Sequence, residues 1–126
     1  MNYEELIIKI CHKALEILNV SKITFRPMKR KSHVNTKRGF VIGRTNLRTG
    51  LITIDIYTPK KRKKKKISSV LRILCHEVAH HQKKPFQEKY KGKWIIRQHY
   101  PGFYRQVNKN IKKLKNDIIL NEFFKK

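Results

Sequence analysis

Residues 76–80, His-Glu-Val-Ala-His, are the part of the sequence best suited to chemistry. If they lie on a helix, His76 and His80 share one face, with their Cα atoms about 6 Å apart along the axis. Two imidazoles in that position can bind one Zn²⁺ ion. Glu77 would lie beside the ion, where it can take a proton from zinc-bound water. The motif therefore predicts zinc-assisted peptide hydrolysis, with one Zn²⁺ per chain and Glu77 as the general base.

The residues around this motif indicate that it does lie on a helix. From Ser68 to about Lys84, just before Pro85, apolar residues recur at helical spacing. They are Val70, Leu71, Leu74, Cys75 and Val78. A metal site on a partly buried helix is therefore expected, rather than a surface helix that happens to carry histidines.

A catalytic zinc site needs a third protein ligand and an open fourth position. His81 follows His80 directly and would point about 100° away around the helix, so we expect it outside the ligand set. The longer motif HExxHxxGxxH is absent, because Lys83 and Phe86 occupy its next two defined positions. Three later residues remain candidates for the third ligand: Glu88, His99 and Glu122.

His99 begins the segment HYPGFY (99–104). An HExxH motif followed later by H-x-P-x-F-[WY] resembles the SprT/YgjP-like group of small zincin metallopeptidases and is similar to the WLM group. The resemblance covers residues 51–108. It implies a zinc site with His76, His80 and His99 as ligands and Glu77 as the base. It also implies that the aromatic pair Phe103 and Tyr104 anchors the following helix.

The same resemblance implies that an extended substrate lies along an edge strand above the motif helix. The matching segment is Leu51–Tyr57, which alternates between an isoleucine face and a second face. We expect the second face to contact a bound peptide by strand addition, although an ordinary internal strand is an alternative. Its residues are Thr53, Asp55 and Tyr57. Candidates to stabilise the oxyanion lie near His99, and they are Arg97, Tyr100 and Tyr104.

The rest of the sequence predicts the elements that position this motif. The expected elements are a helix at 3–18 with Asn2 as N-cap, strands at 23–26, 39–45 and 51–58, the motif helix at 68–84, and a helix at 103–118 that breaks near Asn116. The expected loops are 28–38, a basic loop at 59–67, and an insert at 82–98 that forms a lip beside the cleft. Helix, three strands and then helices indicate a small α+β domain, and the resemblance implies that its fold is a minimal zincin-like one. We expect residues 1–126 to form this one domain.

The chain is strongly basic, with 32 Lys and Arg against 8 Asp and Glu, and a formal charge of +24. Such a field favours nucleic acid as a partner, although a lysine-rich surface without a partner is the alternative. In the insert, Tyr90 and Trp94 lie among lysines and suit stacking on exposed bases. The basic loop contains an unbroken run that we expect to be flexible, solvated and able to contact phosphates. The run is Lys60, Lys61, Arg62, Lys63, Lys64, Lys65 and Lys66.

Several classes of protein are excluded by the sequence. GxxxxGK[ST] and GxGxxG are absent, which argues against nucleotide-binding α/β folds, and the apolar runs are too short to span a membrane. Cys11 and Cys75 lie among aliphatic residues, so we expect reduced core thiols and a cytoplasmic protein. Two alternatives to a peptidase remain. One is a basic nucleic-acid-binding protein with a structural or vestigial metal site, and the other is a metal-dependent nuclease using His80, His81 and Asn108.

Overall fold

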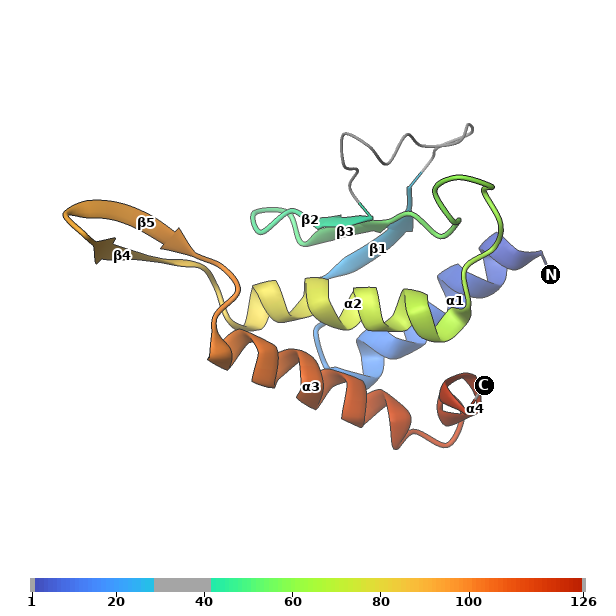
Figure 1. The fold of residues 1–126 in the computed structure, drawn as a ribbon. Helices are drawn as coiled ribbons and strands as arrows, with labels where there is room; N and C mark the ends of the chain where they lie inside the picture. The colour runs from blue at the N-terminus through green and yellow to red at the C-terminus, as the bar shows by residue number, and fades with distance from the viewer. Residues whose placement is uncertain (1, 29–41, 126) are drawn as a thin grey trace.

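The structure is a computed structural model that describes residues 2–28 and 42–125. Its elements are α1 (Tyr3–Ile17), β1 (Thr24–Pro27), β2 (Gly43–Thr45), β3 (Leu51–Ile54), α2 (Ile67–Gln82), β4 (Phe86–Tyr90), β5 (Lys93–Arg97), α3 (Pro101–Lys115) and α4 (Asn121–Phe124). Figure 1 shows a small sheet above α1 and α2, with α3 packed below α2. The expected α+β fold is confirmed. Residues 39–41 of one expected strand and 29–38 of one expected loop lie outside the described residues.

The three strands β1, β2 and β3 form one sheet in the order β1-β3-β2. β1 runs parallel to β3, with Phe25 opposite Ile52, and β2 runs antiparallel to β3, with Thr45 opposite Ile52. The expectation that 51–57 is an edge strand is therefore wrong, because β3 is paired on both sides. The edge strand that lies over α2 is β2. Alternation of side chains identified the strand, but alternation carries no information about its neighbours.

The hydrophobic core lies between this sheet and the helices α1 and α2. The expected apolar face of β3 is confirmed, since Ile52, Ile54 and Ile56 are all buried. They meet the apolar face of α2, whose residues Val70, Leu71 and Leu74 are buried. Cys11 and Cys75 are buried free thiols in the same core, and burial raises the pKa of Cys75 to about 12. Neither thiol is therefore activated as a nucleophile.

The helices begin and end close to where the sequence predicts. Asn2 caps α1, since its side-chain oxygen accepts a hydrogen bond of 2.8 Å from the Glu5 backbone N–H. α3 begins at Pro101, which has no N–H to leave unpaired in the first turn, and it ends at Asn116 as expected. Among the described residues, no helix combines the length and apolar character that crossing a membrane requires.

The basic run 60–66 is folded back on the protein, which corrects the expectation of a flexible, solvated segment. The Arg62 guanidinium donates to both carboxylate oxygens of Asp55 at 2.8 and 2.9 Å. The Lys65 ammonium donates to the Asp55 carbonyl at 2.6 Å, and the Tyr3 hydroxyl donates to the Lys65 carbonyl at 2.7 Å. Five side chains of the run remain exposed, and they are Lys60, Lys61, Lys63, Lys64 and Lys66.

The insert 82–98 contains an antiparallel hairpin that the sequence analysis did not predict. β4 and β5 pair from Phe86 opposite Arg97 to Tyr90 opposite Lys93. Lys91 and Gly92 connect them with φ of 49° and 77°, and two successive positive φ values are typical of a type I′ turn. The hairpin extends away from the sheet and the helices, at the end where α2 stops and α3 starts (Figure 1).

Candidate metal centre

Three histidines meet where α2 ends and α3 begins. His76 and His80 project from the same face of α2, as their four-residue spacing requires, and His99 lies just before the first turn of α3. One nitrogen from each ring lies within 4.8 Å of the others. Among the described residues these three form the group able to hold a metal ion. The structure thus brings together the set that the resemblance implied.

The distance between two of the ring nitrogens fits a zinc ion. Nε2 of His80 and Nε2 of His99 are 3.3 Å apart. Two ligands at about 2.0–2.1 Å from a tetrahedral ion are themselves about 3.3–3.4 Å apart. The three imidazoles leave one tetrahedral position without a protein ligand, which is the arrangement that catalytic zinc sites require. The donor set and its spacing therefore fit Zn²⁺.

Phe103 is a platform beneath the three imidazoles. Its side chain is fully buried, and its ring lies 4.5 Å from the His80 ring, 5.0 Å from His76 and 5.1 Å from His99, measured between centroids. The anchoring role implied for Phe103 agrees with this packing. Tyr104 is half exposed, although its ring contacts that of Phe103, so it anchors the helix much less. Rings fixed in this way keep the histidine nitrogens converged.

The surroundings of the histidines favour neutral imidazoles, the form that binds metals. Burial, together with the neighbouring histidines, lowers the pKa of His80 to about 4. Burial and His99 also lower the pKa of His76. A neutral ring keeps a lone pair available as a ligand. The cluster is therefore ready to accept a cation at neutral pH.

Glu77 is buried directly beside this cluster, under the edge strand β2. Its side chain is only 7% exposed, and burial raises its pKa to about 7. Gly43 lies directly over it: a Cβ at that position would be in van der Waals contact with Glu77 Oε1 at 3.4 Å and in tight contact with Ile73 Cγ2 at 3.0 Å. A carboxyl group with a near-neutral pKa can both accept and return a proton at pH 7. Its position matches the predicted general base.

The histidines and Glu77 open into a cleft of about 360 Å³ between β2 and the base of the hairpin. The cleft is lined by Gly43, Thr45, Leu47, His76, Glu77, His80, Pro85, Gln98 and His99. Gln98 was not predicted, although its position before His99 could have suggested it. His81 lies outside the histidine group, as expected, and its ring is hydrogen-bonded to the Thr45 hydroxyl. That contact connects α2 to the edge strand.

The other candidates for the third ligand lie elsewhere, whereas among the oxyanion candidates the Tyr104 ring lies 6.2 Å from the His99 ring between centroids. Glu88 is exposed on the hairpin, where it accepts a 2.7 Å hydrogen bond from Arg97. Glu122 belongs to α4, which follows α3 at the opposite end from His99. The Tyr100 hydroxyl donates to the Lys84 carbonyl at 3.1 Å. Arg97, Tyr100 and Tyr104 do not line the cleft.

The three residues expected to contact a peptide also lie away from the cleft. Thr53 shares the sheet face opposite the core with its strand partners Arg26 and Arg44. Asp55 is fully buried against Arg62, and Tyr57 packs its ring 5.7 Å from that of Tyr3. The expectation of a peptide-contacting face on this strand is therefore wrong. Thr53 belongs to the central strand β3, whereas Asp55 and Tyr57 follow that strand and contact Arg62 and Tyr3 of the same chain.

Comparisons with known proteins add little to this geometry. No protein-family model and no curated protein matches the sequence. Among solved structures, the chain is similar to the metallopeptidase zymogen abylysin of Pyrococcus abyssi. The sequence identity is 21%, the TM-score is 0.47, and the match covers 93% of this chain and 87% of that one. A match at this TM-score carries no information about the chemistry of the site.

Proposed function

We propose that this protein is a zinc-dependent metallopeptidase. His76, His80 and His99 would hold the ion, and Glu77 would act as the general base. The observation that carries this proposal is the meeting of three convergent imidazoles with a buried carboxyl group at an open cleft. Each part has a use in hydrolysis, and a site with only a structural role would not need the carboxyl group.

A bound zinc ion supplies Lewis acidity and makes a coordinated water more acidic. The chain itself supplies proton transfer and orientation. Glu77 can take a proton from water and then deliver it to the departing amine, since its pKa is near neutrality. Phe103 holds the imidazoles in their orientation by packing against them, and the buried surroundings of Glu77 exclude competing water from one side.

The edge strand β2 is suited to hold the substrate in extended form. The Asn46 N–H donates to the Leu51 carbonyl and the Asp55 N–H to the Ile42 carbonyl, so positions 42 and 46 direct their backbone groups toward β3. By the alternation of an antiparallel pair, Gly43 and Thr45 direct theirs away from β3, toward the edge at which no other described strand pairs. Both residues line the cleft. A peptide added at this edge would lie across the metal site.

The two alternative functions fit this site less well. A structural metal site usually closes with four protein ligands, whereas this cluster offers three and faces a cleft. The proposed nuclease residue Asn108 is exposed on α3 and does not line the cleft. We extend the peptidase proposal in two ways: the protein would belong to the SprT/YgjP-like group, and it would act on DNA-associated proteins. The second extension requires a surface that binds nucleic acid.

The catalytic test is Glu77→Gln in the full chain. The variant should keep its zinc content and its fold but lose hydrolysis of an unfolded protein, because an amide cannot accept the proton from water. Glu88→Gln is the matched control, since Glu88 is exposed on the hairpin. Zinc is measured by atomic absorption, and cleavage by gel electrophoresis. A zinc-loaded wild type that cleaves no unfolded protein or peptide would contradict the proposal.

The ligand test is His99→Ala. Its zinc affinity should fall sharply, while His12→Ala, which changes an exposed histidine of α1, should leave it unchanged. Competition with a chromophoric chelator measures both affinities. Unchanged zinc affinity in His99→Ala would show that the ligand assignment is wrong.

A further inference from the structure

The hairpin formed by β4 and β5 has two chemically different faces. In an antiparallel pair, residues opposite each other point to the same side, and neighbours along a strand alternate. One face therefore carries Gln87, Lys89, Trp94 and Ile96. The other carries Phe86, Glu88, Tyr90, Lys93, Ile95 and Arg97. We call these the tryptophan face and the tyrosine face.

The tyrosine face is occupied by contacts within the chain. Phe86 packs against Tyr100 with ring centroids 5.0 Å apart, which ties the hairpin to the start of α3. Arg97 donates to Glu88, and its guanidinium lies 5.7 Å from the Tyr90 ring centroid. The Lys91 ammonium lies 5.4 Å from the same ring. Tyr90 is half exposed, but two cations of its own hairpin already lie against its ring.

The tryptophan face is open. Trp94 is 70% exposed and Ile96 is 61% exposed, while Lys89 lies directly across from Trp94. Aromatic rings this exposed are costly to hydrate, so an exposed tryptophan beside a lysine suggests a bound partner. This face carries no acidic residue, because Glu88, the single acidic residue of 83–98, points to the other face.

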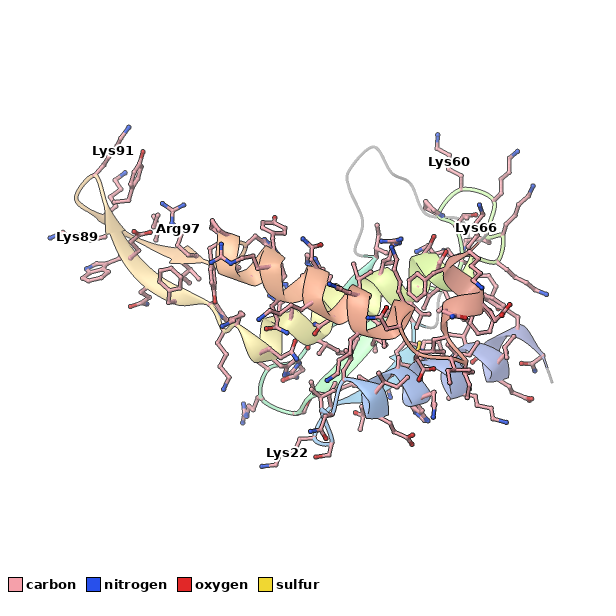
Figure 2. All side chains as sticks on the ribbon, turned by 90° about the horizontal axis from the view of Figure 1, so that it is seen from below. Lys22, Lys60, Lys66, Lys89, Lys91 and Arg97 are labelled. Carbon is pink, nitrogen blue, oxygen red and sulfur yellow. The ribbon has the colours of Figure 1, made fainter. Side chains whose placement is uncertain are left out.

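The charge of the hairpin as a whole indicates the kind of partner. Residues 83–98 contain six basic residues and one acidic residue, in a chain of net charge +24. Figure 2 shows Lys89, Lys91 and Arg97 grouped at the hairpin, far from Lys60 and Lys66 at the other end of the molecule. A polyanion would be attracted to the hairpin, and an indole ring can stack on unpaired bases. Duplex DNA hides its base faces, so single strands fit this surface best.

We propose that the tryptophan face of the hairpin binds single-stranded nucleic acid, with Trp94 stacking on a base and Lys89 contacting a phosphate. Stacking and phosphate contact are common to DNA and RNA. The sequence favoured Tyr90 and Trp94 acting together, but the two rings lie on opposite faces, and two cations of the hairpin already lie against the Tyr90 ring. The hairpin begins after Pro85 and ends before Gln98, and both of these residues line the metal cleft. A bound strand therefore lies near the proposed peptidase site without depending on it.

The test uses the full-length protein and a fluorescein-labelled 20-nucleotide oligo(dT), with binding followed by anisotropy across a salt series. Trp94→Ala should weaken binding about 5- to 150-fold, the loss expected for one stacked base. Duplex DNA of the same length should lose less than twofold. Trp94→Phe should recover most of the affinity, and Tyr90→Ala is the matched control on the opposite face. An oligo(U) arm distinguishes RNA from DNA by relative affinity.

Two further measurements keep the test decisive if Trp94→Ala does not fold. Trp94 is the only tryptophan of the chain, so its fluorescence in the wild type should be quenched when oligo(dT) binds. Lys89→Ala should reduce the slope of log affinity against log salt by about 0.7, the value for one phosphate on a single strand. The absence of quenching at saturating oligo(dT) would overturn the proposal. So would a Trp94→Ala variant that binds oligo(dT) normally but hydrolyses an unfolded protein with a raised KM, because the face would then hold a polypeptide.

Discussion

Replacing Arg62 should lower the free energy of unfolding, because this residue of the basic run neutralises a buried charge. Asp55 is fully buried, and the Arg62 side chain is 14% exposed. Their two hydrogen bonds, of 2.8 and 2.9 Å, form a bidentate pair. Arg62→Ala leaves the Asp55 carboxylate in the protein interior without its main counter-ion. The prediction is a loss of stability, not a loss of phosphate contacts.

The size of the effect follows from the burial of the pair. Removing one partner of a buried ion pair costs about 3–5 kcal/mol of stability. Because Arg62 is partly exposed, we expect a loss of about 3 kcal/mol for Arg62→Ala. In the variant the Tyr57 N–H still donates to the Asp55 carboxylate and Lys65 to the Asp55 carbonyl, but the two hydrogen bonds and the charge of Arg62 are lost. Small domains are stable by about 5–15 kcal/mol, so the expected loss is a large part of the total. Lys61→Ala, at an exposed position of the same run, should change stability by less than about 0.5 kcal/mol.

The loss should also depend on pH. Burial alone would raise the pKa of Asp55, but hydrogen bonds from Arg62 and from the Tyr57 N–H, together with the charges of Arg62 and Lys65, lower it below 3.8. A lowered pKa in the folded state stabilises the protein above pH 3.8, and this contribution disappears as the pH falls through the folded-state pKa. The difference between wild type and Arg62→Ala should therefore be largest near neutrality and should shrink in acid.

Urea unfolding followed by far-UV circular dichroism measures this difference at pH 7 and at pH 3. Helical signal is preferable to tryptophan fluorescence, because Trp94 lies exposed on the hairpin and reports little on the core. Equal stability of Arg62→Ala and Lys61→Ala at pH 7 would refute the reasoning, as would a difference that grows in acid.

Two further substitutions test the packing that positions the site. Phe103→Ala should lower the free energy of unfolding by about 3–5 kcal/mol and weaken zinc binding, because it removes the ring that packs against the three imidazoles. Urea unfolding measures the first effect, and chelator competition measures the second. Gly50→Ala should destabilise more than Gly92→Ala in the same unfolding assay. Both glycines have positive φ (82° and 77°), but a Cβ at Gly50 would collide with the Lys22 carbonyl, whereas a Cβ at Gly92 meets nothing within 4 Å. Equal losses of stability in Gly50→Ala and Gly92→Ala would contradict the prediction that the Gly50 Cβ collides with the Lys22 carbonyl.

The parts of the site that could be predicted are those determined by local spacing. His76 and His80 share a helix face because of the geometry of one helical turn, and the apolar residues around them identify the buried side of α2. His99 was named by its resemblance to a longer motif, while the residues alone left Glu88 and Glu122 open. Only the packing of α3 on α2 brings His99 to within 3.3 Å of His80, and a contact across 19 residues is not a local property.

The parts that could not be predicted depend on partners distant in the sequence. Asp55 alternates with isoleucines like a solvent-facing residue, yet Arg62 neutralises it and makes its burial possible. The basic run was expected to be solvated because like charges repel, but the Asp55 carboxylate binds Arg62, and hydrogen bonds of Lys65 to the Asp55 carbonyl and from Tyr3 help to fold the run back. The hairpin was missed because its strands are short and have no face buried in a core. Its turn also depends on the positive φ of Lys91, a residue type that does not signal such turns.

The positions of these features along α2 make the proposed roles separable. α2 has 16 residues and so is about 24 Å long. The basic run precedes its first turn, whereas the histidines occupy its second half and the hairpin follows its last turn (Figures 1 and 2). A change in the run therefore acts on stability from one end of the helix, and a change in Trp94 acts on a surface beyond the other. Arg62→Ala, studied under conditions where it is still folded, should bind zinc and oligo(dT) as the wild type does, and a specific loss of either would contradict this separation.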